Sequence, residues 1–307
     1  MAHHRLAPDR FHNALGPFEP VLRVLPGDSL TAATLDARGL DAGGVERGSR
    51  PNPMTGPIWI EGAEPGDALG VAIEAVVPAR DWGWTRPGLA ANVVEPEAAT
   101  RFAPGGEPVR WSIDREAGTT RPEAPPQGLE GLVLPLAPMV GCFGVAPAGG
   151  QAISTATSGR HGGNMDWRGF RAGCTVWFPV ATDGALFFLG DGHAVQGDGE
   201  IAGTGVETAC EMTVTFSLRK GWAIGWPRGE DGAGRFTVGN ARPLDGALQH
   251  ATTEMADWLG EEGLDPVAAG LLLGQVVQYE VGNVYNPAYT VVCRVPAEFW
   301  PGPGTNR

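Results

Sequence analysis

The 307-residue sequence contains few charged residues and almost no lysine. Charged residues make up 19% of the chain, and Lys220 is the only lysine, so arginine supplies nearly all the positive charge. No run of five or more basic residues occurs, and the net charge is −13. Because binding to nucleic acid depends on concentrated positive charge, we expect no nucleic-acid partner.

Cysteine is also scarce, and its spacing excludes two kinds of small stabilised domain. The four cysteines lie far apart without a C-x-x-C pair, which indicates neither a zinc knuckle nor a disulfide framework. Three of them, Cys174, Cys210 and Cys293, stand in apolar strand-like surroundings typical of buried, reduced thiols. The N-terminus lacks the apolar core of a signal peptide, and prolines and glycines interrupt the uncharged residues 131–159. We therefore expect a cytoplasmic protein without a membrane span.

Glycine and proline, by contrast, are abundant, with 47 and 27 copies. Such a composition favours many turns between short strands, and the hydrophobic content of 42% is that of a well-folded chain. We predict a mainly β protein. Residues 1–240 would form a sandwich-like or barrel-like β body, and residues 241–307 a smaller α+β portion.

Local patterns refine this prediction. Pro-Gly-Asp occurs at residues 26–28 and 65–67, each time between strand-like runs, which predicts two hairpin turns with glycine at positive φ. Apolar residues at helical spacing predict a helix within residues 247–263. Asp265-Pro266 would cap and open a second helix. A strand over residues 289–295 would close the chain. The dipeptides Asn52-Pro53 and Asn286-Pro287 read as turns.

The most informative segment is residues 161–207, which gathers imidazoles and carboxylates between glycines and apolar runs. Its members are His161, Asp166, Asp191, His193, Asp198, Glu200 and Glu207. Such groups are costly to bring together unless something neutralises them. Asp191 and His193 are two residues apart, so an extended backbone places them on one face, and Asp198 and Glu200 repeat that spacing. Nitrogen and carboxylate ligands without cysteine suit Zn²⁺, Mn²⁺, Mg²⁺ or Ca²⁺.

The same residues permit a plainer interpretation. Asp-Gly is a common turn dipeptide, and each acid taken singly is more often a turn residue than a ligand. Glu207 suits either a general base or a buried ion pair. No generic metal signature is matched, so the density of the cluster carries the metal hypothesis.

Several of these motifs closely resemble the acetamidase/formamidase family. They are HGGNMD (161–166), FFLGDGHAVQGDGE (187–200), GTGVE (203–207), NPMTGPIWIEGAEPGD (52–67), PMVGCFGVAPA (138–148) and EMADWL (254–259). The resemblance runs over most of the chain. It implies hydrolysis of a short, linear, non-peptide amide to a carboxylate and ammonia, a mostly β fold, and a bound metal ion, zinc or calcium.

The resemblance also implies site residues. His161, Asp166, Asp191 and His193 are expected to hold the divalent metal. Chemistry, rather than a sequence pattern, divides the remaining roles: Glu200, Glu207 and Asn164 would be catalytic, and the backbone N–H groups of Gly162 and Gly163 would hold the oxyanion. The long loops 79–125 and 149–160 would line the pocket and leave the exact amide open.

Three alternatives stay open at this point. A thiol nucleophile would be Cys142, whereas a lysine-dependent amidase has only Lys220 to draw on. The cluster could instead serve a non-catalytic β-rich module that binds a metal or a small polar ligand. It could also be a structural calcium site that includes Asp198. A homo-oligomer is expected because exposed strand edges need covering.

Overall fold

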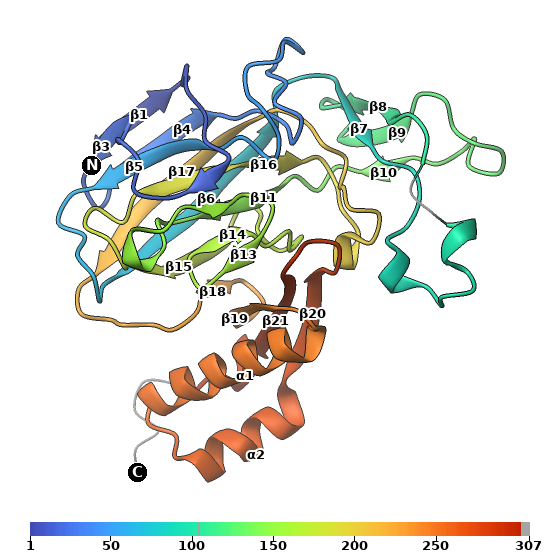
Figure 1. The fold of residues 1–307 in the computed structure, drawn as a ribbon. Helices are drawn as coiled ribbons and strands as arrows, with labels where there is room; N and C mark the ends of the chain where they lie inside the picture. The colour runs from blue at the N-terminus through green and yellow to red at the C-terminus, as the bar shows by residue number, and fades with distance from the viewer. Residues whose placement is uncertain (103–104, 302–307) are drawn as a thin grey trace.

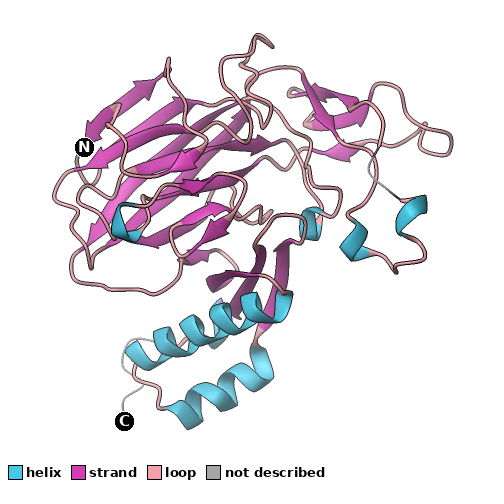
Figure 2. Cartoon of the chain, viewed as in Figure 1, coloured by secondary structure: helices cyan, strands magenta, loops and turns pink. Residues whose placement is uncertain are grey.

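The computed structural model describes residues 1–102 and 105–301, so the end of the predicted C-terminal portion, 302–307, lies outside the described residues. Strands account for 38% and helices for 15% of the structure, which confirms a mainly β protein (Figure 2). No helix in the described ranges is long and apolar enough to cross a membrane.

The larger sheet has nine strands in the order β1-β4-β17-β6-β15-β18-β19-β21-β20 (Figure 1). All neighbours are antiparallel except β1 and β4. The strands span His3–Leu6 (β1), Ser29–Ala33 (β4), Cys210–Arg219 (β17), Ala68–Pro78 (β6), Thr175–Pro179 (β15), Arg228–Asp231 (β18), Gly234–Ala241 (β19), Tyr289–Pro296 (β21) and Gln278–Asn283 (β20).

A six-stranded sheet, β13-β14-β11-β16-β5-β3, packs against the larger one. Its strands span Ser158–Gly159 (β13), Gly162–Asn164 (β14), Met139–Gly144 (β11), Phe187–His193 (β16), Thr55–Ile60 (β5) and Leu22–Val24 (β3). Smaller sheets pair Leu134–Pro135 (β10), Thr119–Pro122 (β9), Val109–Asp114 (β8) and Trp82–Thr85 (β7), and join Ile153–Ser154 (β12) to Ala14–Leu15 (β2). Short 3₁₀ turns are Ala91–Val93 (η1), Ala99–Arg101 (η2), Ala148–Gly150 (η3), Asp198–Glu200 (η4) and Ala297–Phe299 (η5).

The main core lies between the two large sheets, as in a sandwich. Alternate residues of β4 and β17 point inward and are buried, which is the period-two pattern of a sheet with one face in the core. Strand β16 is instead buried at every position. Phe187 and Leu189 face the main core, and Phe188 faces a smaller apolar cluster on the other side. A strand enclosed on both faces offers a dry place for polar groups.

The two Pro-Gly-Asp turns are real, but the prediction that they form hairpins is wrong. Gly27 and Gly66 have φ of 96° and 94°, as the turn requires. Each turn, however, leaves a strand of the six-stranded sheet (β3 or β5) and enters a strand of the nine-stranded sheet (β4 or β6). The local turn chemistry is the same in both cases. It does not specify the strand with which the segment after the turn pairs.

Two helices cover the end of the larger sheet, α1 (Leu244–Glu261) and α2 (Pro266–Val276), as the sequence predicts. Asp265 caps α2 by accepting a hydrogen bond from the Ala268 N–H at 2.8 Å. Helix α1 packs its apolar face on β19 and β21. The boundary expected at residue 240 falls inside β19, and β20 and β21 extend the sheet of the body.

Candidate functional site

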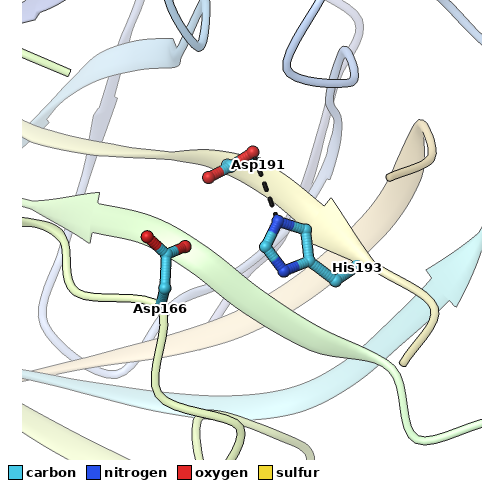
Figure 3. Close-up of side chains that lie close together, drawn as sticks. All are labelled: Asp166, Asp191 and His193. Atoms are coloured by element: carbon cyan, nitrogen blue, oxygen red, sulfur yellow. Dashed lines mark ion pairs between the residues drawn. The ribbon is translucent and has the colours of Figure 1, made fainter. Parts of the chain in front are cut away.

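Strand β16 presents two side chains of the site on one face, as their spacing predicts. The Asp191 carboxylate and the His193 imidazole approach with 3.5 Å between Oδ1 and Nε2. Asp166, in the loop after β14, points toward them (Figure 3). One ligand atom from each of the three lies within 4.8 Å of the others, and all three residues are buried.

A second group shares the same histidine. His193, Glu200 and Glu207 also bring ligand atoms within 4.8 Å of one another. Glu207 Oε1 lies 3.1 Å from His193 Nε2. The Glu207 backbone pairs with Trp84 of β7, so the small sheet helps to fix this carboxylate.

Asp198 and Glu200 do not share a face, although their spacing predicts that they would. They lie in turn η4 rather than in a strand, with Gly199 at φ 79° and Glu200 at φ 44°. The backbone turns between them, so Glu200 is buried while Asp198 is exposed and pairs with Arg168 at 2.5 Å. The structure therefore does not place Asp198 in the cluster, which removes the reason to include it in a structural calcium site.

Gln196 fixes the orientation and the tautomer of His193. Its Nε2 donates to the backbone oxygen of Asp166 at 2.6 Å, so its Oε1 must accept. That oxygen lies 2.8 Å from His193 Nδ1, which is therefore the donor. In the neutral imidazole, Nε2 then presents a lone pair toward the carboxylates. Metal-binding histidines are typically held in this way.

Three asparagines support the carboxylates. Asn52 Nδ2 donates to Asp191 Oδ2 at 3.0 Å, and Asn283 and Asn286 donate to Asp166 Oδ2 at 3.1 and 2.7 Å. The sequence pattern indicated Asn52 and Asn286, each followed by proline, only as turn residues. It did not indicate Asn283. Amide donors at one oxygen of each aspartate leave the other oxygen available.

The available atoms are buried and converge. Among the described residues, four atoms of the cluster have no hydrogen-bond partner: Asp166 Oδ1, Asp191 Oδ1, His193 Nε2 and Glu207 Oε2. Buried polar atoms are nearly always satisfied, so these unpartnered atoms, which fall in the two ligand groups that share His193, call for a ligand. Three carboxylate oxygens and one imidazole nitrogen are a donor set that suits a divalent cation.

Burial and mutual repulsion hold protons on this cluster. Desolvation, reinforced by the Asp191 carboxylate, raises the pKa of Asp166 to about 7. Desolvation also raises the pKa of Glu207 to about 8 and that of Glu200 well above its ordinary value. For His193, desolvation alone would lower the pKa, but Glu207 and Asp191 outweigh it and raise the pKa. A bound cation would supply the missing positive charge instead.

Gly141 of β11 leaves the space that the carboxylates occupy. A Cβ at this position would lie 2.6 Å from Asp166 Oδ1 and 2.8 Å from Asp191 Oδ2. Both distances are shorter than a carbon and an oxygen tolerate, so only glycine fits here. The strand that separates the two aspartates thus passes between them without a side chain.

The buried acids Asp191, Glu200 and Glu207 form the floor of a cavity of about 530 Å³, whereas Asp166 and His193 do not line it. Among the predicted site residues, those that line it are Asn164, Asp191, Glu200 and Glu207. Other lining residues include Arg38, Arg50, Asn52, Trp84, Arg86, Thr204, Tyr285 and Asn286. The lining residues come from segments that are far apart in the sequence. As expected, residues 79–125 contribute to the lining.

Three predicted residues lie elsewhere. His161 belongs to neither ligand group and lines a separate cavity of about 390 Å³, where desolvation lowers its pKa to about 4. Gly162 and Gly163 are in β14, which pairs with β11, and they do not line the main cavity. A Cβ on Gly162 would lie 2.5 Å from the Phe143 backbone oxygen, so close strand packing explains this glycine. Of the motif HGGNMD, the structure thus brings Asp166 into the cluster and leaves His161, Gly162 and Gly163 outside it.

Cys142 is unsuited to the alternative role of nucleophile. It packs in an apolar cluster with Leu15, Met54 and Phe188. Desolvation, with Asp191 and Asp166 adding to it, raises the pKa of its thiol well above the ordinary value, which disfavours the reactive thiolate. All four cysteines are buried and free.

Comparison with known proteins identifies the family. The model of the acetamidase/formamidase family matches residues 146–227, the segment that contains Asp166, Asp191, His193, Glu200 and Glu207. The crystal structure of an acetamidase from Yersinia enterocolitica is 31% identical, with a TM-score of 0.84 over 98% of this chain and 93% of that chain. The chain belongs to the acetamidase/formamidase family.

Two curated members of the acetamidase/formamidase family are similar over part of their length. The acetamidase of Mycolicibacterium smegmatis is 29% identical over 48% of this chain, and the formamidase of Methylophilus methylotrophus is 25% identical over 69% of it. The matched part makes up 48% and 64% of those proteins. This chain thus spans about half to two thirds of the length of the curated relatives it matches.

Proposed function

We propose that this protein hydrolyses a short, linear, non-peptide amide to a carboxylate and ammonia, with a divalent cation held by Asp166, Asp191 and His193. The observation that carries the proposal is the convergence of unpartnered buried atoms of Asp166, Asp191 and His193, of which Asp191 also lines the cavity. The names of the relatives, acetamidase and formamidase, support the substrate class.

The donor set favours zinc over calcium. Calcium prefers six to eight oxygen ligands, whereas zinc accepts an imidazole nitrogen together with carboxylate oxygens. Three protein ligands would leave one position of the ion for water or substrate, as in catalytic zinc sites. When bound, such a cation supplies a Lewis acid that polarises a carbonyl and makes water more acidic. Homo-oligomer formation and a cytoplasmic location stay predictions from the sequence.

The residues around the floor would handle the protons. Hydrolysis adds water across the C–N bond: the carbonyl carbon gains the hydroxyl, and the nitrogen leaves with the proton. Glu207, buried with Oε1 3.1 Å from His193 Nε2, would take a proton from water and return it to the nitrogen. Glu200, buried beside it, is the second candidate for this role.

Asn164 would hold the oxyanion in place of Gly162 and Gly163. It lines the cavity, and its Oδ1 accepts from Asn52 Nδ2 at 3.0 Å, which orients the amide. Within the described ranges its own Nδ2 donates no hydrogen bond to protein. That N–H is therefore free to donate to the carbonyl oxygen of a substrate as negative charge develops on it.

Ammonia release from formamide, acetamide and propionamide tests the proposal. We expect release that a chelator abolishes and zinc restores, with elemental analysis showing the metal in the active sample. His193→Ala should be inactive, whereas His250→Ala on α1, where the ring stacks on Trp226, should keep activity. If no amide is hydrolysed by the zinc-loaded protein, the non-catalytic binding module is the better interpretation.

A further inference from the structure

Three arginines stand at the cavity above the carboxylates. Arg38, Arg50 and Arg86 all line it, and Arg50 and Arg86 are exposed while the acids on the floor are buried. The lining of the cavity therefore differs in burial and charge: its acids are buried, and its guanidinium groups are more exposed to solvent. This placement is unusual in a chain with a net charge of −13, which repels anions at long range.

None of the three arginines pairs with a carboxylate in the described part of the chain. Arginines elsewhere do, as Arg80 does with Asp36 and Arg228 with Glu254. All three line the same cavity; burial and the charges of Arg50 and Arg86 lower the pKa of Arg38, whereas Asp36 and Glu107 raise it. Guanidinium groups that line one cavity, with no ion pair among the described residues, provide a site for an anion.

Two of the arginines are held in place by neutral groups. The Arg38 guanidinium lies 4.0 Å from the ring centre of Trp84, itself a lining residue. Arg86 Nη1 donates to the Tyr285 hydroxyl at 3.0 Å. Stacking and a neutral acceptor position both cations without an ion pair, which leaves their guanidinium groups available to an anion.

Cavity size agrees with a substrate longer than acetamide. Cavities of about 300–1,000 Å³ commonly enclose drug-sized ligands, and this one measures about 530 Å³. Formamide or acetamide bound at the floor would leave the part of the cavity that the three arginines line filled with solvent.

Building on the proposed function, we infer that the preferred substrate is a linear amide with a carboxylate at its far end, which Arg38, Arg50 and Arg86 recognise while the amide group lies at the acidic floor. The reaction would be H₂N–CO–R–COO⁻ + H₂O → ⁻OOC–R–COO⁻ + NH₄⁺. Atoms and charge balance, and no further reactant is needed.

A pair of matched substrates tests this inference on the intact, zinc-loaded protein. Succinamate carries the carboxylate, and 4-oxopentanamide replaces it with a methyl ketone of similar shape. We expect kcat/KM for ammonia release to be at least about tenfold higher for succinamate, since hydrogen bonds to charged groups contribute that much. High salt should raise the KM of succinamate more than that of the ketone.

The arginines are then tested directly. In the double variant Arg50→Gln, Arg86→Gln we expect the ratio of the two kcat/KM values to fall about tenfold, mostly through the KM of succinamate. Arg121→Gln, which removes an exposed arginine outside the cavity, should leave the ratio unchanged.

Equal hydrolysis of the two substrates would overturn the inference, as would an unchanged ratio in the double variant. An altered oligomeric mass with an unchanged ratio would overturn it too, because the arginines would then serve contacts between copies. In each case hydrolysis of acetamide would leave the proposed function intact. Failure to hydrolyse any amide would instead overturn both.

Discussion

Without its cation, the proposed metal centre should make the protein less stable as the pH rises through neutrality. The pKa of Asp166 is 3.8 in an unfolded chain and about 7 in the folded protein, because burial and Asp191 disfavour its charge. Between these values the folded state binds a proton that the unfolded state releases. The free energy of unfolding therefore falls with increasing pH in this window and levels off above about 7.

The size of the effect follows from the width of the window. From pH 5.5 to about 7, Asp166 alone should lower the free energy of unfolding by about 2 kcal/mol, since each pH unit corresponds to about 1.4 kcal/mol. For a chain of this size that is roughly a 4 °C decrease in Tm. His161, with a folded pKa of about 4, acts in the opposite direction below pH 6.5.

A difference between two proteins measures the contribution of Asp166 together with its effect on the protons of Glu200 and Glu207. We would measure Tm by scanning calorimetry at pH 5.5 and 8 for metal-free wild type and for Asp166→Asn, in which the His161 contribution is the same. Wild type should lose roughly 4 °C more than the variant between the two pH values. Zinc should raise the Tm of wild type more at pH 8 than at pH 5.5, because its binding displaces the protons.

The control is Asp198→Asn, which changes an exposed aspartate of the same segment. Its Tm should depend on pH as wild type does. If metal-free wild type and Asp166→Asn show the same pH dependence, Asp166 holds no proton in the folded state, and the electrostatic account of the cluster is wrong.

Three further changes probe the walls of the site. Gly141→Ala should abolish zinc binding and ammonia release, since the new Cβ meets both aspartates, whereas Gly274→Ala, which has open space in α2, should bind zinc normally and be stabilised by about 1 kcal/mol. Gln196→Leu should weaken zinc binding by about 10–100-fold in a competition assay with a chelator, because the imidazole loses its acceptor. Cys142→Ala should retain ammonia release, and an inactive but folded variant would revive the thiol mechanism.

Local pattern anticipated some of the contacts. The side chains of Asp191 and His193, two residues apart in β16, do meet, although Asp191 adopts positive φ rather than the extended backbone that the prediction assumed. Helix α2 begins where Asp265 and Pro266 predict, because capping depends on neighbouring residues. Both predictions use contacts within a few residues, which a single sequence contains.

Predictions that depend on irregular backbone or on distant partners were less successful. Asp198 and Glu200 diverge because Gly199 and Glu200 adopt positive φ, which their spacing does not reveal. His161 has the right chemistry but belongs to neither ligand group and lines another cavity. Asn52 and Asn286 read as turns because the carboxylates they support are more than a hundred residues away. Long-range pairing of this kind cannot be read from local pattern.

Backbone strain gives an independent argument that the cluster is functional. Among the residues that the structure describes, six non-glycine residues have positive φ, and Asn52, Asp166, Asp191 and Glu200 are four of them. Each such residue costs about 1–3 kcal/mol, a large fraction of the stability of a protein. Glycine at any of these positions would relieve the strain, but it would also remove the side-chain amide or carboxylate that contributes to the cluster. A fold selected only for stability would not concentrate strain at these four side chains, whereas one that must aim several carboxylates at a single point has reason to do so.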